Sequence, residues 1–282
     1  MAVNIKVLIL TYNEIENIRY CIESVKNWAE EVIVVDSGST DGTVDNLHDM
    51  DIRVEYNHFK NFSSQRNFAL SLIPKSYIGW IIFLDADEFL PREIKKEIGQ
   101  AIKSKQYSSY YLNRRFIWMG KWIKRGYYPS HIIRLFRNGH ARCELRSVNE
   151  HLIVDGETGY IKADFIHECH KPISYWIEKH IYRAQLEADE LLIERNNELQ
   201  PSLKKGRIEA KRWIRLNIWQ RLPIFLRPFM FFFYRLFIQG AILDGKIAFG
   251  YHFLQCLWFT MLIDIFYLDQ KINKFKKDKN NK

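Results

Sequence analysis

Two carboxylates stand one residue apart at the end of an apolar run in this chain. Residues 80–84 read Trp-Ile-Ile-Phe-Leu, and Asp85 and Asp87 follow directly. Alternate side chains of an extended chain point to the same side, so the two carboxylates can converge at a strand end. Oxygen ligands in this position suit Mg²⁺ or Mn²⁺, which take few protein ligands and bind the phosphates of a substrate. A solvated turn can have the same residues, so the motif needs support from the rest of the chain.

Polar clusters also follow two earlier apolar runs. Thr11, Tyr12 and Glu14 come directly after residues 5–10, and Asp36 ends the run 31–36. Segments with helical periodicity separate the runs, which predicts an α/β fold whose mostly parallel sheet is covered on both faces. Ligands of such sheets bind beyond the carboxyl ends of the strands. All three polar clusters are expected there, and this agreement predicts a ligand site.

The composition favours a folded protein with a basic C-terminal quarter. Of 282 residues, 47% are hydrophobic and 15% aromatic, which excludes general disorder. The net charge is +9, but residues 203–282 contain 16 Lys and Arg against 5 Asp and Glu, so the excess is local and favours an anionic partner. The four cysteines are scattered and no secretory leader is visible, so we expect the catalytic part to stay in the cytoplasm.

The C-terminal quarter also contains two long apolar stretches, residues 222–243 and 251–268. Arg227 and Arg235 interrupt the first and Asp264 the second, and charges are costly at the centre of a bilayer. Insertion at the membrane interface, with basic side chains at anionic headgroups, is therefore favoured over spanning. Packing onto the catalytic domain or a dimer interface is the other alternative. Nucleic acid binding is disfavoured, because the aromatic residues form runs rather than isolated stacking platforms.

Three blocks together resemble the signature of family 2 glycosyltransferases, which have the GT-A fold. They are Thr-Tyr-Asn-Glu at 11–14, Asp-Ser-Gly-Ser-Thr-Asp-Gly at 36–42 and Asp-Ala-Asp-Glu at 85–88. Arg-Leu-Phe-Arg at 134–137 and Val-Asn-Glu-His at 148–151 are similar to the subgroup that contains lipopolysaccharide core glucosyltransferases. The resemblance implies metal-dependent, inverting transfer of a sugar from a nucleotide-sugar, typically a UDP-sugar, to a glycan or glycolipid hydroxyl in bacterial envelope synthesis.

The resemblance also implies an organisation of the chain. Residues 1–202 would form the GT-A catalytic domain, with a nucleotide-sugar-binding half at 1–106 and an acceptor half at 107–202. Residues 203–282 would be a basic, aromatic, helical segment that associates with the membrane. The enzyme would then work at the cytoplasmic face of the bacterial inner membrane, as a peripheral or monotopic protein.

Roles in donor and metal binding follow from the family. The residues expected to contact the donor are Thr11, Tyr12, Glu14, Asp36, Arg66 and Asp85. Asp87 and His167 are expected to hold Mg²⁺ or Mn²⁺, whereas Glu88 is expected to be an acid at the start of a helix. Other interpretations stay open, because Asp36 could cap a turn, Arg66 could be a surface arginine, and His167 could be a buried core histidine.

Inverting transfer needs a base that deprotonates the acceptor hydroxyl. Glu150 is the candidate, with Glu144 and Asp155 as alternatives, because the acidic pair more usual in the family is absent. The competing interpretation is that Glu150 forms a structural salt bridge and takes no part in catalysis. Transfer to polyprenyl phosphate, nucleotidyl transfer and a non-catalytic membrane-bound adaptor with a degenerate sugar-nucleotide fold are the rival functions.

Overall fold

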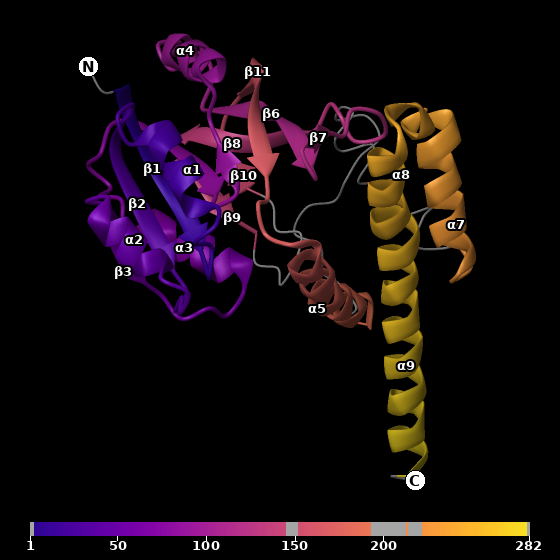
Figure 1. Ribbon diagram of the computed structural model, residues 1–282. Coiled ribbons are helices and arrows are strands. Elements are labelled where there is room, and N and C mark those ends of the chain that lie inside the picture. Colours follow the sequence, from indigo (N-terminus) through magenta and orange to yellow (C-terminus); the bar gives the residue numbers. More distant parts are fainter. Residues whose placement is uncertain (1–2, 145–151, 193–212, 214–221, 281–282) are drawn as a thin grey trace. The chain divides into compact units, whose positions relative to one another are not determined.

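The structure is a computed structural model that describes residues 3–144, 152–192, 213 and 222–280 (Figure 1). The chain divides into two compact units, Met1–Pro172 and Ile173–Lys282. The first unit is α/β, and the second is helical in its described part. The boundary expected between residues 202 and 203 lies outside the described residues.

Four strands of the first unit form a parallel array in the order β3-β2-β1-β4. They are β1 (Val3–Thr11), β2 (Ala29–Asp36), β3 (Arg53–Tyr56) and β4 (Trp80–Asp85). Helices α1 (Ile18–Val25), α2 (Thr43–Asp49) and α3 (Phe62–Ser71) lie between them in the sequence. This alternation of strands and helices confirms the predicted α/β class. All four of these parallel strands come from the N-terminal part of the chain.

The sheet continues with strands from later in the chain, in the order β4-β8-β6-β11-β5. They are β8 (His131–Arg137), β6 (Ser109–Trp118), β11 (Thr158–Glu168) and β5 (Glu88–Phe89), and β7 (Lys121–Trp122) pairs with β6. Only the β6–β11 pair is parallel here. Helix α4 (Arg92–Ala101) follows β5, and β9 (Ala141–Cys143) and β10 (Leu152–Val154) form a separate two-stranded sheet.

Both faces of the sheet are covered by apolar side chains, and the alternation along the strands decides which residue faces which side. Val7 and Ile9 belong to one buried cluster, which also contains residues of α1 and α4. Leu8 belongs to a second cluster on the other face, with Ala69 of α3. Burial on both faces explains why β1, β2 and β4 are largely apolar, whereas β3, at the edge of the sheet, is not.

In its described part, the second unit contains α5 (Ile173–Leu192), α7 (Leu226–Phe233), η2 (Tyr234–Ile238), η3 (Ala241–Asp244), α8 (Lys246–His252), η4 (Phe253–Trp258) and α9 (Phe259–Asn280). Helices α5 and α9 pack through Ala184, Ala188, Phe259 and Ile263, all buried. Among the described residues, one continuous helix of 29 residues, Lys246–Lys274, is long and apolar enough to cross a membrane by length and composition, with a mean hydropathy of 1.3 over its most apolar 18 residues. Length and composition of one helix are weak evidence of a span.

Candidate nucleotide and metal site

The polar ends of three neighbouring parallel strands lie side by side. The pairing of β1 with β2 puts Thr11 opposite Asp36, and the pairing of β1 with β4 puts Leu10 opposite Asp85. Thr11 is buried, and its hydroxyl has no hydrogen-bond partner in the part of the chain that the structure describes. Tyr12, one residue on, is 54% exposed. The strand ends therefore form one polar edge with a buried, unsatisfied hydroxyl, as an edge that takes a ligand would.

Asp36 organises the loop after β2. Its Oδ2 accepts hydrogen bonds from the backbone N–H groups of Gly38 and Ser39, at 2.7 and 2.8 Å, and its Oδ1 accepts one from the Ser39 hydroxyl. Gly38 has a φ of 98°, a conformation that favours glycine. These contacts are those of an Asx-type turn. A contact of Asp36 with the nucleotide-sugar donor stays a prediction. The donor would have to bind a carboxylate that already accepts hydrogen bonds from the loop.

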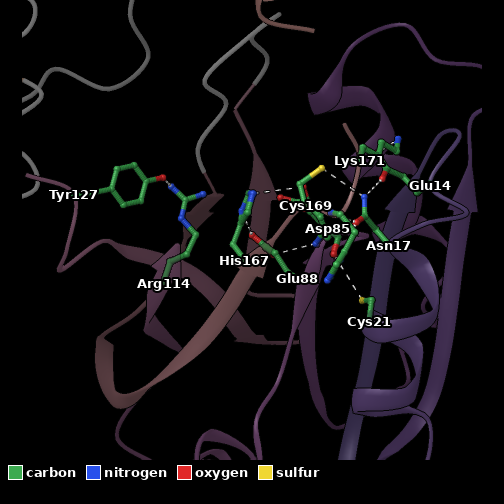
Figure 2. A network of polar contacts seen from close by, with 12 residues as sticks. Glu14, Asn17, Cys21, Asp85, Glu88, Arg114, Tyr127, His167, Cys169 and Lys171 are labelled. Carbon is green, nitrogen blue, oxygen red and sulfur yellow. Dashed lines mark hydrogen bonds and ion pairs between the residues drawn. The ribbon is translucent and has the colours of Figure 1, made fainter. Parts of the chain in front are cut away.

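A buried ion pair ties the loop after β1 to the segment that follows β11. Lys171 Nζ lies 3.0 Å from Glu14 Oε1 and also donates to the backbone carbonyl of Asn13. The Asn17 amide donates to Glu14 Oε2 at 2.7 Å, and Asn17 Oδ1 accepts the backbone N–H of His170 at 2.7 Å. Figure 2 shows Lys171, Glu14 and Asn17 in this arrangement. Glu14, which is expected to contact the nucleotide-sugar donor, therefore uses both of its carboxylate oxygens to hold this loop in place.

Asp85, the first acid of the motif, lies between two arginines. Its Oδ1 is 3.0 Å from Arg66 on α3, and its Oδ2 is 2.6 Å from Arg134 on β8. Desolvation by burial would raise the pKa of Asp85, but the charges of Arg134 and Arg66 outweigh it and hold the pKa well below its usual range. Only 11% of the Arg66 side chain is exposed, so it is not an ordinary surface arginine. Asp85 is thus a fixed, ionised acceptor.

Glu88 corrects one expectation. The sequence suggested an acid at the start of a helix, but Glu88 lies in β5 and is fully buried, and α4 begins four residues later at Arg92. Its Oε1 is 2.5 Å from Arg134, and its Oε2 accepts the backbone N–H of Asp85 at 3.0 Å. Arg134 therefore bridges Glu88 and Asp85. Arg137, three residues further along β8, instead donates to the carbonyls of Ser104 and Tyr107.

Asp87 and His167 form the part of the site that fits a divalent cation. His167 Nε2 lies 3.4 Å from Asp87 Oδ2, and its Nδ1 lies 3.7 Å from Glu88 Oε1 (Figure 2 labels His167 and Glu88). His167 Nδ1 is buried without a hydrogen-bond partner among the described residues. No group of three or more potential ligands occurs in the described part of the chain. Two protein ligands still suit an ion that keeps waters and takes the phosphates of its substrate.

The candidates for the base are placed unequally. Glu150 lies outside the described residues. Glu144 is buried at the end of β9, where its backbone carbonyl accepts the hydroxyl of Ser63 at 2.6 Å. Asp155 is exposed in the turn after β10. The choice among these three residues stays a prediction.

Open α/β sheets bind their ligands beyond the C-terminal ends of the parallel strands, and Asp36 and Asp85 lie at those ends here. The sequence profile of glycosyl transferase family 2 matches residues 6–164. The chain therefore belongs to this family, and the resemblance inferred from the three sequence blocks is confirmed. The predicted GT-A class agrees with the observed α/β sheet.

Two relatives that are at least 31% identical in sequence match parts of the chain. It is 38% identical to a glycosyltransferase of Rickettsia bellii over 106 residues, which is 38% of this chain and 35% of that protein. It is 31% identical to the lipopolysaccharide core biosynthesis glycosyltransferase LpsC of Rhizobium meliloti over 163 residues, 54% of this chain and 57% of that protein. The chain thus spans about a third of the first relative's length and somewhat more than half of the second's.

Solved structures also match. One is the glucosyl-3-phosphoglycerate synthase of Mycobacterium tuberculosis, in complex with Mn²⁺, uridine diphosphate and glucosyl-3-phosphoglycerate. The TM-score is 0.33 at 20% sequence identity, and the match covers 40% of this chain and 43% of that chain.

Proposed function

We propose that the protein is an inverting glycosyltransferase. It moves a sugar from a nucleotide-sugar donor, a UDP-sugar, to a hydroxyl of a glycan or glycolipid in bacterial envelope synthesis of the lipopolysaccharide type. Membership of family 2 supports the transfer, and the similarity to LpsC supports the class of acceptor. The observation that carries the proposal is the polar edge at which Thr11, Asp36 and Asp85 lie on neighbouring strands.

The mechanism would be a single displacement in which the chain's own residues orient the donor and remove a proton. Thr11, Tyr12 and Asp36 border the nucleoside, and Asp85 is held as a hydrogen-bond acceptor by its two arginines. Glu150 would take the proton of the acceptor hydroxyl. Asp87 and His167 would hold Mg²⁺ or Mn²⁺, which when bound neutralises charge on the departing diphosphate.

Membrane association belongs to the same proposal. Residues 203–282 contain the basic excess of the chain, and the apolar helix Lys246–Lys274 lies within them. An anionic, lipid-linked acceptor at the cytoplasmic face of the inner membrane matches both properties. We therefore propose a peripheral or monotopic enzyme.

Release of UDP from a panel of UDP-sugars, with and without Mn²⁺ or Mg²⁺, tests the proposal. Slow hydrolysis of the donor needs no acceptor, so the assay works while the acceptor is unknown. We expect cation-dependent release from one sugar, which identifies the donor. If no donor is hydrolysed and UDP does not bind in the presence of Mn²⁺, the UDP-sugar proposal is wrong, and GDP- and CDP-linked donors are tested before the adaptor alternative. Release of pyrophosphate instead of UDP would indicate a nucleotidyltransferase.

Replacing Glu150 with glutamine separates a hydroxyl acceptor from a phosphate acceptor. A general base contributes about 10²–10⁴-fold to a rate, so we expect Glu150→Gln to lower glycosyl transfer by that factor while donor binding is kept. The measurement is single-turnover transfer to a lipid-linked glycan acceptor. Asp155→Asn and Glu144→Gln are tested beside it, because a loss of transfer in one of them instead would assign the base to that residue. An unchanged rate in all three variants would favour polyprenyl phosphate, because a phosphate acceptor needs no strong base.

A further inference from the structure

The second unit contains a helical hairpin that exposes apolar side chains at its tip. The hairpin comprises α7 and η2, the turn 239–245 that includes η3, and the returning α8 and η4 (Figure 1). Its inner side is packed, because Phe232, Leu236, Ala241 and Cys256 form one buried cluster. The hairpin is therefore a folded element whose outer side chains point away from its own core.

The most exposed apolar residues of the hairpin gather at the tip. Ile238 is 76% exposed and Leu243 72%, with Phe237 and Ile242 beside them in sequence at 60% and 46%. The exposed apolar side chains continue along both arms, at Leu226, Phe229, Met230, Phe233, Tyr234, Phe249 and Phe253. Single exposed apolar residues are normal on a protein surface, whereas a run of this kind marks a site of interaction.

The charged side chains of the hairpin are arranged so that the charge exposed near the tip is positive. Arg227, which interrupts the apolar stretch in the sequence, is buried against Asp264 of α9, with 2.7 Å from Arg227 Nε to Asp264 Oδ1. Asp244 in the turn is also buried. Arg235 lies over the Phe231 ring and donates to the Gln239 side chain, and Lys246 is exposed at the start of α8.

We propose that the tip of this hairpin inserts into an anionic lipid surface. The apolar side chains of residues 237–243 enter the boundary between headgroups and acyl chains, and Arg235 and Lys246 meet the lipid phosphates. The inference deepens the membrane association in the proposed function. Its test needs neither sugar donor nor acceptor, so the insertion of the tip and the proposed glycosyl transfer can fail separately.

The packing of α9 favours insertion over spanning. The C-terminal part of the long apolar helix packs against α5 through Phe259 and Ile263, next to the buried pair of Asp264 and Arg227. Helix α5 exposes charged side chains, among them Glu178 and Asp189. A spanning helix would carry these charges into the hydrocarbon, which is costly. In the described part of this unit, exposed large apolar side chains are most numerous on the hairpin, and α5 and α9 have only a few.

Flotation with vesicles tests the proposal directly. The full-length protein is mixed with vesicles of phosphatidylcholine alone or of phosphatidylcholine with phosphatidylglycerol, and binding is compared with that of Ile238→Asp/Leu243→Asp. Two charged residues at the tip should lower the partition coefficient about a hundredfold, since burial of two large apolar side chains is lost. Ile78→Asp in the first unit is the matched control, because Ile78 is 91% exposed and should not affect binding.

The charge of the tip is tested with Lys246→Gln. One lysine near an anionic surface corresponds to about a fivefold change in binding, so this variant should bind phosphatidylglycerol vesicles about five times more weakly and neutral vesicles unchanged. The tip variants alter exposed positions, and far-UV circular dichroism and the melting temperature report whether they fold. Equal flotation of wild type and the double variant would overturn the proposal. So would a wild-type dimer in sedimentation velocity that the double variant dissociates, because the tip would then be an interface between two copies.

Discussion

Replacing Asp87 with asparagine is expected to abolish the stimulation of UDP release by Mn²⁺ and to lower the rate about 10²–10³-fold. The carboxylate faces His167 at 3.4 Å, and this pair is the part of the described site that fits a divalent cation. An ion that neutralises a diphosphate leaving group stabilises the transition state by several kcal/mol, which corresponds to this factor. Asparagine keeps the size of the side chain and removes the charge that holds the ion.

The measurement is the rate of UDP release as a function of Mn²⁺ concentration for the wild type and Asp87→Asn. Asp51→Asn is a matched control, because it removes the same charge from an exposed turn to which no role in the site is assigned. Titration calorimetry with UDP and Mn²⁺ adds a readout that does not depend on turnover. If Asp87→Asn keeps both the Mn²⁺ response and the calorimetric binding, the cation is not held by this carboxylate and its assignment is wrong.

The strand ends could be predicted because buried parallel strands have a simple sequence pattern. Each is a continuous apolar run, so the first polar residue after it marks the carboxyl end, as Thr11, Asp36 and Asp85 do. The topology puts β2, β1 and β4 next to one another, and the three residues therefore share one edge. A local pattern was sufficient here, because the rule that parallel strands end at one edge supplied the long-range information.

The partners of these residues could not be predicted in the same way. Glu88 follows the motif like a helix-start acid, and only the fold shows that Arg134, 46 residues later, neutralises it. The strand β11, which carries His167, is half-buried with mixed polar and apolar residues, so it lacks the apolar run that marks the parallel strands. In the sequence, Arg227 and Asp264 stand as isolated charges inside two apolar stretches, whereas in the fold they pair with each other.

Replacing Arg134 with methionine is expected to lower the free energy of unfolding by about 3–5 kcal/mol. Arg134 lies 2.5 Å from Glu88 and 2.6 Å from Asp85, and only 5% of its side chain is exposed. Removing the cation leaves the fully buried Glu88 without its guanidinium partner, and breaking a buried pair from one side costs about this much. Denaturation by urea at pH 7 measures the change.

A second substitution distinguishes stability from the positioning of Asp85. Arg134→Met/Glu88→Gln removes both charges of the buried pair, and glutamine can still accept the backbone N–H of Asp85, so the double variant should regain most of the lost stability. It should nevertheless bind UDP about tenfold more weakly than the wild type, because one of the two arginines that fix the Asp85 carboxylate is absent. A double variant as unstable as Arg134→Met would show that the uncompensated charge of Glu88 is not the cause. Stable protein with wild-type binding would show that Arg66 alone positions Asp85.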